Sequence, residues 1–127
     1  MKPVITPNAP TAIGPYSQAV EQGGVVYCSG QIALDPASGQ LVAGGTAAET
    51  ERVLDNLQAV LAAAGLGFEH VVRVTIYLVD LADFATVNDI YGRYVRPPFP
   101  ARATVGVAAL PRAARVEIDA VAVRSRD

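Results

Sequence analysis

The stretch TAAETERVLDNLQAVLAAAGLGFEHVVRVTIYLV, residues 46–79, decides the fold because it joins a helical pattern to a strand pattern through one short turn. Thr46 followed by Glu49 is typical of a capping box at a helix start, and Gly65 is typical of a helix end. Between them, apolar residues recur at helical spacing: Val53, Leu54, Leu57, Val60, Leu61 and Ala64. Residues 71–79 alternate and are rich in β-branched side chains. The stretch predicts a helix over 46–64 and a strand over 71–79.

Downstream of this unit, the sequence predicts a second helix and two more strands. Asp83 is the expected cap of the helix, and Pro97-Pro98 cannot continue it. The expected buried stripe of this helix consists of Phe84, Val87, Tyr91 and Tyr94. Residues 101–107 and 115–123 both alternate apolar and polar side chains, which predicts two strands.

Upstream, the pattern predicts a β-hairpin. Residues 16–22 and 25–31 flank Gly23-Gly24, and two glycines suit the positive φ angles of a tight hairpin turn. In this register Gln18 faces Ser29 and Tyr16 faces Gln31. Tyr16 and Ser29 are then diagonal neighbours on one face of the hairpin.

The order hairpin, helix, strand, helix, strand, strand predicts an α/β (α+β) fold, a mixed sheet with both helices packed on one face. The length of 127 residues suits a single domain spanning 1–127. Hydrophobic residues make up 51% of the chain and charged residues only 17%, which leaves apolar surface for self-association.

Composition also argues against several classes of function. The formal net charge of −2 gives no cationic field for a nucleic-acid backbone. One cysteine, Cys28, and one histidine, His70, are too few for the usual zinc or iron ligand sets, and Cys28 is expected to be an inert core thiol. No apolar run is long enough for a membrane span, and the N-terminus lacks a secretory pattern. We expect a cytoplasmic protein without metal.

Alternation in the last two strands assigns side chains to faces. Ala103, Val105 and Val107 are matched with Val116, Ile118, Ala120 and Ala122 as the set facing the helices. This leaves Arg102, Thr104, Glu117 and Asp119 on the helix-free face, where we also place Tyr16 and Ser29.

A partner subunit is expected to cover that helix-free face, because it also carries Val20, Val25, Tyr27, Val121 and Val123. A buried Arg102 needs an anionic partner, and its planar guanidinium suits a carboxylate. The hypothesis is a carboxylate-binding site between subunits. Spacing alone leaves ordinary roles open, since Arg102 and Glu117 can be surface residues and Tyr16 and Ser29 can be packing residues.

Four ordered blocks closely resemble the RidA (YjgF-like) reactive-intermediate deaminase family. They are IGPYSQA (13–19), CSGQI (28–32), FATVN (84–88) and PARATV (100–105) together with VEIDAVA (116–122). The resemblance covers nearly the whole chain. It implies a chorismate-mutase-like fold and a homotrimer with sites between subunits. It also implies hydrolysis of 2-imino acids such as 2-iminobutanoate and 2-iminopropanoate to 2-oxo acids and ammonia, with no cofactor.

The resemblance also implies roles for individual residues. Arg102 matches the arginine that binds the substrate carboxylate, and Glu117 matches the glutamate that positions or activates water. Tyr16 and Ser29 match pocket residues, and Gly30 matches a glycine whose backbone lies against the ligand. Thr104 stands where the archetypal deaminases have cysteine, which leaves the substrate range open.

Two other functions remain as alternatives. The same arginine clamp can serve a non-catalytic module that binds small 2-oxo acids, and fold does not separate binding from turnover. An RNA-cleaving or chaperone-like role is less favoured because the chain is acidic and lacks a basic-aromatic patch.

Overall fold

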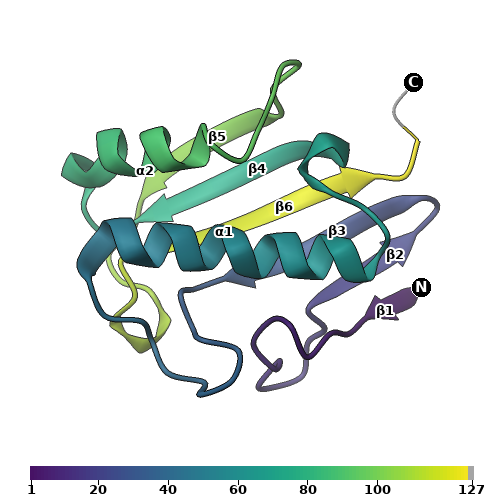
Figure 1. Cartoon of the computed structure of the whole chain (residues 1–127), viewed down its shortest axis with the longest axis horizontal. Coiled ribbons are helices and arrows are strands. Elements are labelled where there is room, and N and C mark those ends of the chain that lie inside the picture. The colour runs from purple at the N-terminus through teal and green to yellow at the C-terminus, as the bar shows by residue number, and fades with distance from the viewer. Residues whose placement is uncertain (126–127) are drawn as a thin grey trace.

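A six-stranded mixed sheet with the strand order β1-β2-β3-β6-β4-β5 forms the centre of the computed structural model, which describes residues 1–125. Its strands are β1 (Lys2–Val4), β2 (Ala19–Gln22), β3 (Val25–Gln31), β4 (Val71–Leu78), β5 (Ala101–Gly106) and β6 (Val116–Val123). Only β4 and β5 pair in parallel, and β5 is an edge strand. Helices α1 (Gly45–Ala63) and α2 (Phe84–Tyr91) lie on one face of the sheet, as predicted (Figure 1).

Helix α1 buries the predicted apolar stripe, but its predicted capping box is wrong. The helix begins after Gly44, whose φ of 115° is left-handed, and no side chain caps it. The Thr46 hydroxyl donates to the Asp83 carboxylate at 2.8 Å, and the Glu49 carboxylate accepts from the Arg115 backbone N–H at 2.8 Å. Both side chains are buried, so tertiary partners replace the local ones.

Helix α2 also departs from the local prediction. Asp83 occupies the N-cap position as predicted, but its side chain makes no capping hydrogen bond; Asp80 instead accepts from the Ala82 N–H in the turn before the helix. Val87, Ile90 and Tyr91 are buried, whereas Phe84 is 40% exposed. Phe84 was expected in the core, but it lies in the first turn of a short helix above the sheet edge, where its ring faces Arg102.

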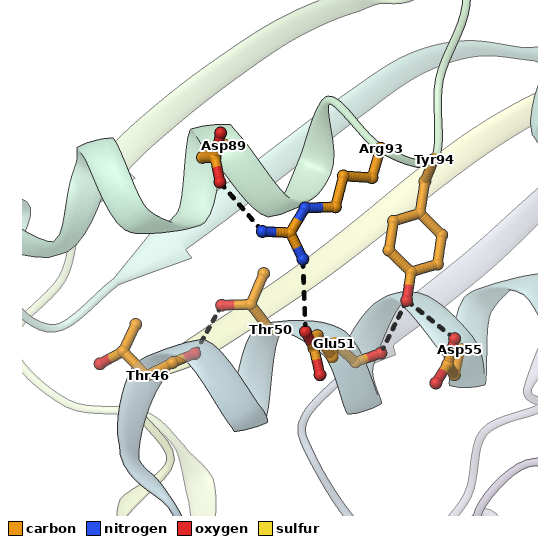
Figure 2. A network of polar contacts seen from close by, with 7 residues as sticks. All are labelled: Thr46, Thr50, Glu51, Asp55, Asp89, Arg93 and Tyr94. Carbon is orange, nitrogen blue, oxygen red and sulfur yellow. Dashed lines mark hydrogen bonds and ion pairs between the residues drawn. The ribbon is translucent and has the colours of Figure 1, made fainter.

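Polar contacts hold α2 and the turn after it against α1 (Figure 2). The Tyr94 hydroxyl donates to the Asp55 carboxylate at 2.9 Å, and Arg93 pairs with both Asp89 and Glu51. Burial, with the Asp55 hydrogen bond, raises the pKa of Tyr94 to about 12. Because exposed ion pairs contribute little, the Tyr94 hydrogen bond contributes more than the Arg93 ion pairs to holding the turn after α2 against α1.

The register of the central strands confirms the predicted faces of β6. Val116, Ile118, Ala120 and Ala122 are at most 2% exposed beneath the helices. Glu117 and Asp119 therefore point to the helix-free face, because successive strand side chains alternate. Tyr27 on β3 is 48% exposed on that same face, which fits the expected apolar surface.

The prediction for β5 is wrong. Arg102 pairs with Val74 and Thr104 pairs with Ile76, and both of these β4 residues are 1% exposed under the helices. Directly paired residues point to the same face, so Arg102 and Thr104 face the helices. Ala103 and Val105 occupy the helix-free face, and Val105 is 39% exposed. Residue 107 lies beyond the strand.

The hairpin turn is confirmed, but its first strand is shorter than predicted. Gly23 and Gly24 have φ angles of 60° and 79°. The Ser29 N–H donates to the Gln18 carbonyl at 3.0 Å, so these residues face each other as expected. Tyr16 lies outside β2, and Gln31 pairs with Ile118 of β6 instead.

No helix within residues 1–125 combines the length and the apolar character that a membrane crossing requires.

Candidate functional site

Four of the predicted site residues line one cavity of about 630 Å³, which we call the Glu117 cavity. They are Tyr16, Ser29, Gly30 and Glu117. The register between β3 and β6 shifts between Cys28 and Gln31, and this irregularity brings the Ser29-Gly30 backbone beside Glu117. The sheet thus brings together residues that the sequence separates by about a hundred positions.

Gln18 builds the wall of the Glu117 cavity that carries Tyr16. Its side chain is 4% exposed, accepts from the Thr6 N–H at 2.8 Å and donates to the Pro10 carbonyl at 2.8 Å. The Ser29 hydroxyl donates to the Ser17 carbonyl at 2.6 Å. These bonds hold the segment before β2 in place, so Tyr16 reaches the cavity without belonging to a strand.

Glu117 places a carboxyl group in the lining of this cavity. Burial raises the pKa of its carboxyl, and the neighbouring Asp119 carboxylate raises it further. Asp119 itself accepts a hydrogen bond from the Tyr77 hydroxyl at 2.8 Å. A carboxyl with a raised pKa exchanges protons closer to neutral pH, which is the property that general acid–base chemistry requires.

Gly30 provides the space that the Glu117 carboxylate occupies. A Cβ built on Gly30 would overlap the Glu117 side chain, and the Gly30 backbone is not left-handed. An alanine here is therefore opposed by the carboxylate and not by backbone strain.

We expect Gly30→Ala to lower the free energy of unfolding by about 1–2 kcal/mol because the Glu117 side chain must move. In a Glu117→Ala background the same change should cost almost nothing, since the overlapping atoms are gone. Urea titrations of both single variants and the double variant, at one protein concentration, measure this. Equal costs in the two backgrounds would show that Gly30 is needed for another reason.

Arg102 lies elsewhere, at the outer edge of the sheet on the helix side. Its Nη1 donates to the Asn88 side-chain oxygen at 2.7 Å, and its guanidinium lies 5.7 Å from the Phe84 ring centroid and 5.2 Å from that of Tyr91. These contacts orient the guanidinium in a second hollow of about 430 Å³, which Phe99 also lines.

Thr104 is not part of the Glu117 cavity as the structure describes it. It lies on the helix face beside Ile76, and its buried hydroxyl has no hydrogen-bond partner within residues 1–125. Its predicted place beside Glu117 on the helix-free face is therefore wrong for a single copy of the chain.

One copy of the chain cannot bring Arg102 and Glu117 to the same small molecule. Tyr77 of β4 pairs with Glu117 of β6 on one side and with Val105 of β5 on the other. Arg102 is therefore separated from Glu117 by two strand spacings across the sheet and by three residues along β5. With strands about 4.8 Å apart and a rise of about 3.3 Å per residue, the two backbones are about 14 Å apart. The side chains also point to opposite faces. In the 2-imino acids that the family resemblance implies as substrates, by contrast, the carboxylate is bonded directly to the imine carbon.

Three functional candidates were missed at the level of sequence. Asn88 lies in the stretch FATVN (84–88), whose sequence does not indicate that its side chain binds Arg102. Gln18 was predicted only as a hairpin residue opposite Ser29, whereas its buried side-chain amide binds the backbone of the segment that forms one wall of the cavity. Arg112 also lines the Glu117 cavity and lies in a loop with no distinctive pattern.

The expectation that Cys28 lies in the core is confirmed. The thiol is buried in the core, and burial raises its pKa to about 12, so it is protonated at neutral pH. Residues 1–125 contain no group of three or more His, Cys, Asp or Glu side chains arranged to hold a metal ion.

Comparison with known proteins matches residues 6–124 to the family model described as endoribonuclease L-PSP. Protein DfrA of Myxococcus xanthus is 59% identical over 124 residues, which cover 96% of this chain and 95% of that protein. The 2-iminobutanoate/2-iminopropanoate deaminase of Bos taurus is 54% identical over 123 residues, covering 97% of this chain and 90% of that protein. The crystal structure of RidA from an Antarctic Psychrobacter species has a TM-score of 0.93 at 41% identity, covering 97% and 99% of the two chains.

Proposed function

Because this chain belongs to the endoribonuclease L-PSP family, which is the RidA (YjgF-like) family, we propose that it hydrolyses reactive 2-imino acids and their enamine tautomers. The proposed substrates are 2-iminobutanoate and 2-iminopropanoate, and the products are 2-oxo acids and ammonia. The relative from Bos taurus carries this activity in its name.

The observation that carries the proposal is the Glu117 carboxyl, half-buried beside Gly30 with a raised pKa. In the proposed reaction, Glu117 accepts a proton from water while the water oxygen bonds to the imine carbon. The same proton then passes to the nitrogen, which gives a carbinolamine. Glu117 next takes the proton of the carbinolamine hydroxyl and delivers it to the nitrogen, so the carbon–nitrogen bond breaks and ammonia leaves as the carbonyl forms. Since an imine carbon is already electrophilic, positioning and proton transfer suffice without a covalent nucleophile.

Arg102 supplies the carboxylate clamp in this proposal, but from a neighbouring copy of the chain. The separation of Arg102 and Glu117 within one copy supports this arrangement. So does the exposed apolar surface on the helix-free face, where Tyr27 and Val105 are 48% and 39% exposed. We propose a homotrimer, as the family resemblance implies, in which each site combines Arg102 of one copy with the Glu117 cavity of the next.

A coupled assay tests the activity. An L-amino-acid oxidase or a threonine dehydratase generates the imine in the presence of semicarbazide, which traps it as a semicarbazone that absorbs ultraviolet light. We expect the purified protein to lower semicarbazone formation and to speed the release of ammonia. Unchanged rates with several precursor amino acids would refute the deaminase proposal.

The same preparation distinguishes the other candidate functions. A binding module would bind 2-oxobutanoate in calorimetry without speeding ammonia release. A ribonuclease would cleave a labelled single-stranded RNA, and this cleavage would have to be lost in Glu117→Gln to belong to the site.

A further inference from the structure

The turn Pro111–Ala113 before β6 holds two adjacent non-glycine residues in the left-handed region. Arg112 has φ 60° and ψ 24°, and Ala113 has φ 57°. Side chains with a Cβ rarely adopt this conformation because the Cβ crowds the backbone. Strained backbone of this kind is concentrated at functional sites, which makes Arg112 a candidate functional residue.

Arg112 lies at the rim of the Glu117 cavity. Arg112 and Pro111 both line it, together with Tyr16, Ser29 and Glu117. The cavity therefore contains a cation of its own chain, besides the Arg102 that a neighbouring copy is proposed to supply.

The charge of Arg112 is not neutralised by an acidic side chain of residues 1–125. Its Nη2 donates a 3.4 Å hydrogen bond to the Gly39 carbonyl on the exposed surface. Arg93, Arg115 and Arg124, in contrast, each pair with a carboxylate within 4 Å. Arg112 is thus an arginine at a cavity mouth that is available to an anion.

The size and lining of the Glu117 cavity leave room for a longer substrate. Its volume of about 630 Å³ lies within the range of about 300–1,000 Å³ found for sites of drug-sized ligands. A four-carbon acid fills only a part of this space. Ile13, Ile32 and Leu34 line the cavity with apolar surface, and Arg112 adds a positive charge.

We propose that Arg112 is a specificity-determining residue that binds a second carboxylate, so that the Glu117 cavity accepts dicarboxylic 2-imino acids. The inference rests on the proposed deaminase function. Arg102 holds the carboxylate next to the imine carbon, and Arg112 holds the carboxylate at the end of the substrate side chain. The hydrogen bond from the Arg112 Nη2 to the Gly39 carbonyl holds the guanidinium on the surface beside the cavity.

Kinetics with two imines test this. An L-glutamate oxidase supplies the dicarboxylic imine and an L-amino-acid oxidase supplies 2-iminobutanoate. Arg112→Asn removes the charge with a residue that tolerates the left-handed region. We expect it to lower kcat/KM for the dicarboxylic imine by about tenfold or more, through KM, and to change that for 2-iminobutanoate by less than about twofold. Arg112→Lys should recover part of the loss.

Ala113→Gly is the matched control, because it relaxes the same turn and keeps the arginine. It should leave the ratio of the two kcat/KM values unchanged. Equal losses for both imines in Arg112→Asn, or a shifted ratio in Ala113→Gly, would show that the turn matters and the charge does not. Wild-type activity on 2-iminobutanoate alone would overturn the inference and leave the proposed function intact.

If neither imine is hydrolysed, the proposed function fails, and the role of Arg112 is then tested by measuring ligand binding. Calorimetry then compares 2-oxoglutarate with 2-oxobutanoate on the wild-type protein and on Arg112→Asn. A preference for 2-oxoglutarate that disappears in the variant supports the second carboxylate site. Equal affinities in the two proteins overturn it.

Discussion

Arg102→Ala is expected to lower kcat/KM for 2-iminobutanoate by about two to three orders of magnitude, because a charge-assisted bidentate contact to the carboxylate is lost. The guanidinium is already oriented by Asn88 and by two aromatic rings, so little ordering is needed when the substrate binds. Removing it leaves the carboxylate without this contact in both the ground state and the transition state.

Two further variants separate the geometry of Arg102 from its charge. Arg102→Lys keeps the charge but loses the planar fork, so its activity should lie between those of the wild type and Arg102→Ala. Asn88→Ala keeps Arg102 but frees its orientation, and we expect a loss of about tenfold.

The control for surface charge is Arg96→Ala. Arg96 is exposed and donates to carbonyls of its own turn, so activity should be unchanged. Light scattering and circular dichroism on each variant verify that fold and assembly are retained. A fully active Arg102→Ala would refute the clamp.

The faces of the central strands could be predicted from alternation, whereas those of the edge strand could not. β6 lies between β3 and β4 beneath the helices, so a wrong register would bury Glu117 and Asp119. β5 has one neighbour, and its helix face is only partly covered by α2. Arg102 can therefore lie on that face with its guanidinium in a hollow, and nothing in the local pattern forbids it.

Local capping rules failed where tertiary partners were available. Thr46 and Glu49 have the spacing of a capping box, yet their partners are Asp83 and the backbone of Arg115, distant in sequence. Spacing does not encode such partners. The same limit applies to Tyr16, which reaches the Glu117 cavity through the buried amide of Gln18 and not through hairpin register.

The misassigned face of Arg102 has a consequence for assembly. With all site residues on one face, a single chain could have formed the whole site. With Arg102 on the helix side of β5 and Glu117 on the helix-free side of β6, the proposed chemistry requires two copies. This arrangement can be tested by mixing inactive variants.

Arg102→Ala and Glu117→Gln should each be inactive alone, and mixed assemblies of the two should regain activity. If Arg102 of one copy completes the cavity of the next, an intact site needs a Glu117→Gln chain beside an Arg102→Ala chain in the correct order. In a random equimolar mixture, each of the two chains at a site is the required variant with a chance of one half. About a quarter of the sites are then intact, so about a quarter of wild-type activity returns in a closed ring of any size.

Co-expression with two different affinity tags, followed by sequential purification and native mass spectrometry, verifies that mixed assemblies form. Selecting assemblies that contain both tags removes the unmixed ones, so a trimer should then retain one intact site of its three, about a third of wild-type activity. A mixture of Glu117→Gln with Glu117→Ala is the control and should stay inactive, because no copy supplies the carboxyl. Mixed assemblies without recovered activity would place both groups of the site in one chain, which the opposite faces of β5 and β6 argue against.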